Sequence, residues 1–218
     1  MSLKTNVIAS YVGQAWSAIM GLAFIPLYIR YLGMEAYGLI GLFAVLQTAL
    51  AILDLGMTPT LNREMARFTA GATTAEEIRD LLRSIERIVF SFAALIAITV
   101  LALSRYLATH WLNAQRLPLS TVATALAIMA FVVALRFCEG IYRSSLLGLQ
   151  RQVWYNTANA ILATVRNGGA VLVLALVSPT ISAFFIWQAA ASALTVGILA
   201  GGLYSSLPPA TRPAPVRT

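Results

Sequence analysis

The chain has few charged residues and almost no residue that could hold a metal or attack a substrate. Only 11% of its 218 residues are Asp, Glu, Lys or Arg, against roughly a quarter in an ordinary soluble domain. Cys138 is the single cysteine and His110 the single histidine. One cysteine forms no disulfide within the chain, and a nucleophile would need a positioned base beside it. The sequence therefore predicts no disulfide, no metal site, no cofactor and no enzymatic activity.

Acidic residues are scarcer than basic ones, yet the arginines do not indicate a nucleic-acid-binding surface. Eight Asp and Glu stand against fifteen Lys and Arg. The arginines are scattered singly or mixed with acids, and no basic cluster is interleaved with aromatic residues. Because hydrophobic residues make up 59% of the chain, we expect membrane lipids as its surroundings and no nucleic-acid partner. In such a protein an excess of positive charge usually lies in cytoplasmic loops.

Long apolar stretches dominate the sequence. A helix needs about 20 apolar residues to cross a hydrocarbon core of about 30 Å, and its backbone polar groups must be satisfied within the segment. Six stretches qualify, so we predict an all-α integral membrane protein with six transmembrane helices within residues 1–205. The expected spans are Val7–Ile29, Tyr37–Thr60, Ile85–Leu107, Leu119–Leu146, Trp154–Val177 and Ile181–Leu203.

The loops between these spans predict how the chain is oriented. With the N-terminus in the cytoplasm, ten Lys and Arg fall in the inside segments and three in the outside segments. The positive-inside rule then places both termini in the cytoplasm. The tail, 206–218, is polar and rich in proline, and we expect a linker or a disordered end there.

A stretch of mixed charge between the second and third spans predicts an amphipathic helix at about 74–87. Thr74 is followed three residues later by Glu77, which is a capping-box signature. Apolar residues then recur at helical spacing, with arginines and acids on the other face. We expect a cytoplasmic helix that runs into the third span and packs on the membrane surface. A regulatory or partner-binding role is the alternative.

Four charged residues fall inside the predicted spans at more than three residues from either end, namely Asp54, Arg136, Glu139 and Arg166. On the fourth span Arg136, Glu139 and Arg143 occupy i, i+3 and i+7, so Glu139 can pair with either arginine. The formal charges of the four intramembrane residues sum to zero. Two roles stay open for them: a neutralised structural network, or the lining of a cavity.

Arg166 has no acid within its own span and lies near the middle of the membrane, where a charge needs a partner. Asn159 precedes it on one face of polar and small residues. We expect Arg166 either to bind an anionic cargo or to form a fixed ion pair with Asp54 or Glu139. Gln47 lies seven residues before Asp54 on the same face of the second span, so both are expected to face protein or water.

Three blocks of sequence resemble one family: PLYIRYLGMEAYGLIGLFAVLQ, LDLGMTPTLNREMAR and GLQRQVWYN. Their order and their placement on the spans are similar to the N-terminal half of Wzx-type polysaccharide exporters, in the multidrug/oligosaccharidyl-lipid/polysaccharide flippase superfamily. The matching elements are Leu32-Gly33, Tyr37-Gly38, Asp54-Leu55-Gly56 and Arg63-Glu64. The resemblance implies one six-helix lobe of a two-lobe transporter in the bacterial inner membrane. It also implies export of polyprenyl-diphosphate-linked oligosaccharide for polysaccharide or O-antigen biosynthesis.

The resemblance covers one lobe, so the expected partner is a second six-span lobe, supplied by another chain, a missing C-terminal half or a second copy. Arginine suits a diphosphate because it stays charged and presents a planar fork of donors. Two other readings stay open: a truncated or scaffold protein of a polysaccharide-synthesis complex that does not transport, and a drug or metabolite exporter of the same superfamily. The expected substrate-binding or cavity residues are Arg166, Arg136, Glu139, Arg143, Asp54, Gln47 and Asn159.

Overall fold

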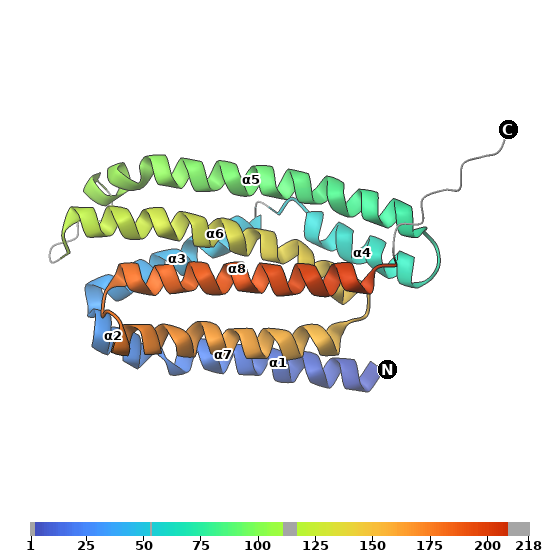
Figure 1. Ribbon diagram of the computed structural model, residues 1–218, viewed down its shortest axis with the longest axis horizontal. Coiled ribbons are helices and arrows are strands. Elements are labelled where there is room, and N and C mark those ends of the chain that lie inside the picture. Colours follow the sequence, from blue (N-terminus) through green and yellow to red (C-terminus); the bar gives the residue numbers. More distant parts are fainter. Residues whose placement is uncertain (1–2, 53, 111–116, 209–218) are drawn as a thin grey trace.

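The protein is a bundle of helices in the computed structural model, which describes residues 3–52, 54–110 and 117–208. Figure 1 shows the long helices running side by side, and these described ranges contain no strand. The helices are α1 (Leu3–Ala23), α2 (Ile25–Leu32), α3 (Met34–Ile52), α4 (Met57–Thr69), α5 (Ala75–His110), α6 (Leu119–Gly148), α7 (Gln152–Leu176) and α8 (Ile181–Ser206).

Several helices are long and apolar enough to cross a membrane, which supports the prediction of an all-helical, multi-pass membrane protein. Five segments meet the requirement in the described part of the chain. They are Ser10–Leu32, Ala75–His110, Leu119–Gly148, Gln152–Leu176 and Ile181–Ser206. α3 contributes a shorter apolar stretch, Met34–Leu50.

The first of these segments contains a break between α1 and α2, at Phe24. Pro26 occupies the first turn of α2. Proline has no backbone N–H to donate to the preceding turn, so an unbroken helix is disfavoured there. At the other end of α2, Gly33 has a φ of 79°, a conformation that glycine adopts without steric cost. This glycine turns the chain from α2 into α3.

The prediction of one continuous helix from Tyr37 to Thr60 is wrong. α3 ends at Ile52 and α4 begins at Met57, while Leu55 and Gly56 have φ angles of 49° and 80°. These left-handed conformations cannot continue a right-handed helix. This part of the chain therefore runs along the bundle as two shorter helices, α3 and α4.

Asp54 caps the N-terminal end of the second of these helices, α4. Its carboxylate accepts hydrogen bonds from the backbone N–H of Thr58, at 3.1 Å, and from the Thr58 hydroxyl. A carboxylate at this place satisfies an amide that has no partner inside the helix and favours the positive end of the helix dipole. The break between α3 and α4 thus explains in part why an acidic residue, Asp54, lies in this apolar stretch.

α5 joins the predicted amphipathic helix and the predicted third span into one helix of 36 residues. The predicted capping box is confirmed: the Thr74 N–H donates to the Glu77 carboxylate at 3.0 Å, and the Glu77 N–H donates to the Thr74 hydroxyl at 3.3 Å. Ile78 and Leu82 on the apolar face are buried. At about 1.5 Å per residue α5 is about 54 Å long, more than the 40–45 Å of a bilayer with its headgroups. An untilted α5 is therefore longer than a bilayer is thick.

α6 is the helix around which the others are arranged, with neighbours on α3, α4, α5, α7 and α8. Its contact with α4 is especially close. A Cβ added to Gly148 would lie 2.7 Å from the Cβ of Met65 and would meet the Asn62 carbonyl oxygen. The Asn62 side-chain amide donates to the Ser144 carbonyl at 3.3 Å. α4 is therefore fixed to the end of α6, although α4 itself is too short and polar to span a membrane.

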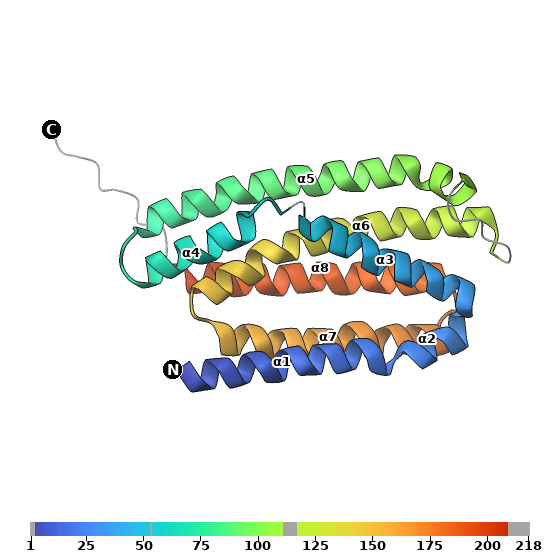
Figure 2. The same cartoon turned by 180° about the vertical axis from the view of Figure 1, so that it is seen from behind.

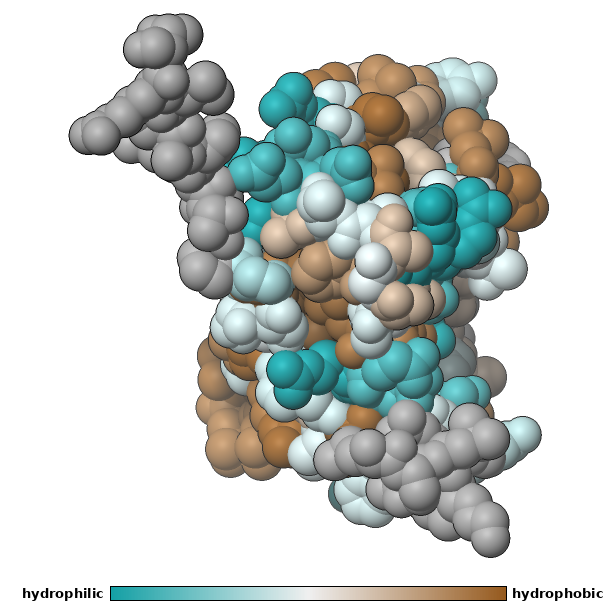
Figure 3. Space-filling view, turned by 90° about the vertical axis from the view of Figure 1, so that its right-hand side faces the viewer, coloured by the Kyte–Doolittle hydropathy of each residue, from teal (hydrophilic) through white to brown (hydrophobic). Residues whose placement is uncertain are grey.

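The start of α1 and the end of α8 lie at the same end of the bundle, together with the α4–α5 and α6–α7 connections (Figures 1 and 2). Figure 3 views this end, where hydrophilic side chains gather in several patches between hydrophobic ones. Such a distribution fits an end that meets water. Most of the predicted tail, 209–218, lies outside the described residues.

Candidate functional site

Arg166 of α7 forms an ion pair with Glu139 of α6 inside the bundle. The guanidinium nitrogen lies 3.3 Å from the carboxylate oxygen, and the two side chains are 14% and 15% exposed. Arg166 also donates a hydrogen bond to the Thr195 hydroxyl of α8 at 2.9 Å. Of the two acids expected as fixed partners, the structure thus places Glu139 beside Arg166. The charge of Arg166 is neutralised within the chain.

Arg136 of α6 is held by neutral groups. Its guanidinium donates to the side-chain oxygens of Gln47 on α3, at 2.8 Å, and Gln188 on α8, at 3.0 Å. It also lies 5.0 Å from the centre of the Phe43 ring, a distance at which a cation is attracted to an aromatic face. Within the described ranges Arg136 makes no ion pair, and its Nε has no hydrogen-bond partner. The interior of the bundle therefore carries one cation without an acid paired to it.

A pocket of about 390 Å³ opens beside Arg136, between α3, α4 and α6. Gln47 and Asp54, both predicted site residues, share its lining with Arg136. Much of the rest is apolar, including Leu50 and Phe137. This pocket combines a cation with a hydrophobic wall, and we call it the Arg136 pocket.

A second pocket, of about 350 Å³, uses α6 as a shared wall and lies between α1, α6 and α7. Its lining is more polar. Three predicted site residues are among the lining side chains: Glu139, Arg143 and Asn159. The Arg143 guanidinium lies 5.9 Å from the centre of the Tyr155 ring, which also lines the pocket. We call this cavity the Tyr155 pocket.

Asn159 has a packing role in addition to its place in the Tyr155 pocket. Its side-chain amide donates to the Ser17 hydroxyl of α1 at 3.0 Å, and Asn156 donates to the Ser10 hydroxyl at 3.2 Å. A Cβ on Gly13 would lie 3.0 Å from the Cβ of Asn156. Small and polar residues therefore let α1 and α7 approach closely, as is common for helices in membranes.

Two residues of this network were not among the predicted ones, Gln188 and Thr195. Both are buried on α8 and bind the two arginines. The signal was present in the sequence, because Gln188, Ser192 and Thr195 stand at i, i+4 and i+7 in an otherwise apolar span. The seven predicted residues thus fall into three arrangements: three line the Arg136 pocket, three line the Tyr155 pocket, and Arg166 pairs with Glu139.

The described residues contain no group of three or more His, Cys, Asp or Glu close enough to hold a metal ion. Comparison of the chain with protein-family models, with curated proteins and with solved structures returns no match.

Proposed function

We propose that the chain forms one lobe of a flippase that moves a polyprenyl-diphosphate-linked oligosaccharide across the bacterial inner membrane. The observation that carries this proposal is Arg136, a cation inside the bundle whose protein partners are neutral amides. A charged side chain near mid-membrane costs at least about 2.5 kcal/mol on insertion scales, so it is expected to serve a partner or a substrate. An anionic cargo would supply the missing negative charge.

The shape of the Arg136 pocket supports an amphiphilic cargo. A diphosphate can accept several charge-assisted hydrogen bonds from a guanidinium. The Nε of Arg136 is buried and has no hydrogen-bond partner within the described residues. Leu50 and Phe137 offer an apolar surface in the same pocket, which suits the first isoprene units of a polyprenyl chain. Asp54 also lines this pocket, but its carboxylate is engaged by Thr58.

The Tyr155 pocket supports a sugar as the remaining part of the cargo. Its hydroxyl, amide and carboxylate groups can exchange hydrogen bonds with sugar hydroxyls, and Tyr155 offers an aromatic surface. In Figure 2, α1 and α3 lie in the foreground, and each of the two pockets lies between one of these helices and α6. In this proposal a second lobe covers that face and completes the cavity.

The proposal includes an arrangement in the membrane. α3 and α4 together make the second of six crossings, and both termini lie in the cytoplasm. The ten-to-three distribution of Lys and Arg supports this orientation, as does the position of both helical ends at one end of the bundle (Figure 1).

The proposal is tested by glycan export in a strain that lacks its own flippase. The chain is expressed together with a matching second lobe, and surface glycan is measured against the abundance of the protein in the membrane. Arg136→Gln should reduce export by about tenfold or more, because one charge-assisted interaction is lost. Arg136→Lys should keep part of the activity, since the charge remains without the planar fork.

Arg87→Gln is the matched control, because Arg87 is an exposed arginine of α5 that lines neither the Arg136 pocket nor the Tyr155 pocket. It should export normally. Normal export by Arg136→Gln at normal abundance would refute the proposed role of Arg136.

A further inference from the structure

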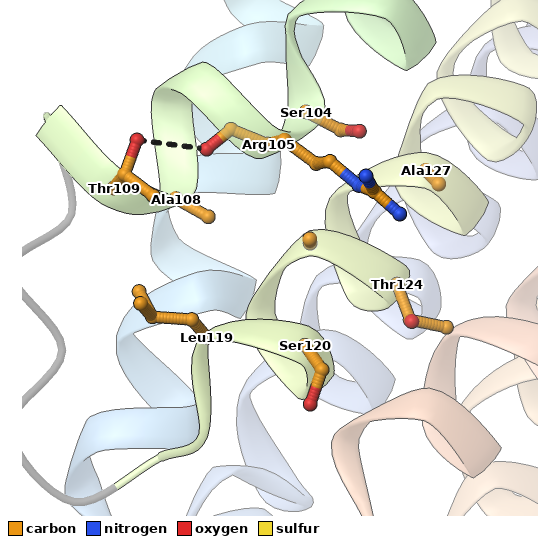
Figure 4. Close-up of a pocket in the computed structure, with 9 residues that line it drawn as sticks. Ser104, Arg105, Ala108, Thr109, Leu119, Ser120, Thr124 and Ala127 are labelled. Atoms are coloured by element: carbon orange, nitrogen blue, oxygen red, sulfur yellow. Dashed lines mark hydrogen bonds between the residues drawn. The ribbon is translucent and has the colours of Figure 1, made fainter.

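A groove of about 430 Å³ lies between the last turns of α5 and the first turns of α6. It is at the end of the bundle opposite the start of α1 and the end of α8 (Figures 1 and 4). Alanines leave space in it, while hydroxyl groups and one guanidinium line its walls. The lining residues that carry polar side chains are Ser104, Arg105, Thr109, Ser120 and Thr124.

Three of these polar groups are free to bind a ligand. The Ser104 and Thr109 hydroxyls donate to the carbonyls of their own helix, at 2.7 and 3.0 Å. The guanidinium of Arg105 and the hydroxyls of Ser120 and Thr124 have no partner in the described part of the chain. Figure 4 shows the Arg105 side chain extending from α5 toward α6. One cation and two hydroxyl donors thus line the same groove.

The groove lies at the depth of lipid headgroups. α6 has 30 residues and is therefore about 45 Å long, roughly the thickness of a bilayer with its headgroups. Arg105 precedes the end of α5 at His110 by five residues, or about 8 Å along the helix. At this depth an arginine can reach phosphate and water at little cost.

An apolar track leads from the groove toward the middle of the membrane. Leu101 and Ile98 lie four and seven residues before Arg105 on the same face of α5, and they are 55% and 64% exposed. On α6, Phe131 follows Thr124 by seven residues and is 53% exposed. A molecule with a phosphate at one end and acyl chains at the other would match both the groove and this track.

We propose that this groove binds the headgroup of an anionic phospholipid, with Arg105 as the cation for its phosphate and Ser120 and Thr124 as hydrogen-bond donors. Charge-assisted hydrogen bonds from arginine to phosphate are about twice as strong as neutral ones. The acyl chains lie against the exposed apolar side chains of α5 and α6. This site is separate from the two pockets beside α6 and does not depend on any transport activity.

The test titrates the purified full chain in detergent with phosphatidylglycerol and counts bound lipid by native mass spectrometry. Arg105→Gln should weaken phosphatidylglycerol binding by about tenfold, because it removes the one cation among the described residues that line the groove. The double variant Ser120→Ala/Thr124→Val keeps the charge and should lose about threefold, through two neutral hydrogen bonds. These residues are exposed, so the variants should stay folded, and gel filtration checks that they do.

Arg30→Gln is the matched control, since Arg30 is also an exposed arginine at this end of the bundle. It should bind phosphatidylglycerol as the parent chain does. Equal binding by Arg105→Gln and Arg30→Gln would overturn the site. Displacement of the lipid by inorganic phosphate at the concentrations at which the lipid itself binds would overturn the lipid assignment, because the acyl chains would then contribute nothing.

Discussion

Replacing Glu139 by glutamine would leave Arg166 charged inside the bundle without its acid. Removal of one partner of a buried ion pair typically costs about 3–5 kcal/mol, because the remaining charge is buried and uncompensated. Both side chains are about one-seventh exposed, 14% and 15%, and Arg166 keeps its 2.9 Å hydrogen bond to Thr195. We therefore expect the lower end of the range, about 3 kcal/mol. The double variant Glu139→Gln/Arg166→Gln removes both charges and should recover most of this loss.

The assay is reversible unfolding in mixed micelles, run on the parent, the two single variants and the double variant, so that the coupling free energy is obtained. The i,i+3 pair Glu64–Arg67 on α4 is the matched control, since Glu64 is 15% exposed, as Glu139 is, whereas its partner Arg67 is 54% exposed. Its coupling should be below about 1 kcal/mol, as is usual for surface pairs. Coupling in the inner pair no larger than in this surface pair would refute the structural account of Arg166.

Three further predictions follow from the fold. Gly148→Ala should lower the free energy of unfolding by about 1–3 kcal/mol, because the new Cβ would push α4 from α6; Gly197→Ala, which meets nothing within 4 Å, should not, and equal effects would contradict the close packing. Asp54→Ala should cost about 1 kcal/mol through the loss of the α4 cap, and an unchanged melting temperature in detergent would contradict that role. In a cysteine-free background, an impermeant maleimide should label a cysteine at Glu35 but not one at Thr73 in intact cells; the reverse pattern would overturn the orientation.

The last three spans could be predicted from the sequence because each is one apolar helix with clear ends, whereas α5 begins ten residues before the predicted third span. The predicted Leu119–Leu146 and Ile181–Leu203 differ from α6 and α8 by two and three residues at one end. The prediction of the second span was wrong because hydropathy alone does not reveal the conformation of the backbone. The pattern remains apolar across Leu55 and Gly56, although their positive φ angles stop the helix.

The residues of the candidate site could be selected from the sequence, but their partners could be given only as alternatives, such as Asp54 or Glu139 for Arg166. Spacing along α6 allowed Glu139 to pair with Arg136 or Arg143, and only the position of α7 brings Arg166 within 3.3 Å of it. Gln188 was missed because the span around it is strongly apolar, although its spacing from Thr195 marks a polar stripe. Polar residues at helical spacing inside a span therefore predict a polar network in the interior, but they do not predict which of its residues bond to each other.

The most direct test of whether Arg136 binds a lipid-linked diphosphate is an affinity measurement on the purified chain. It compares binding of a polyprenyl diphosphate with binding of the matching polyprenol. The parent chain should bind the diphosphate at least about tenfold more tightly than the uncharged alcohol. Arg136→Gln should remove this preference, while Arg67→Gln, which changes an exposed arginine, should keep it. An unchanged preference in Arg136→Gln would contradict the account.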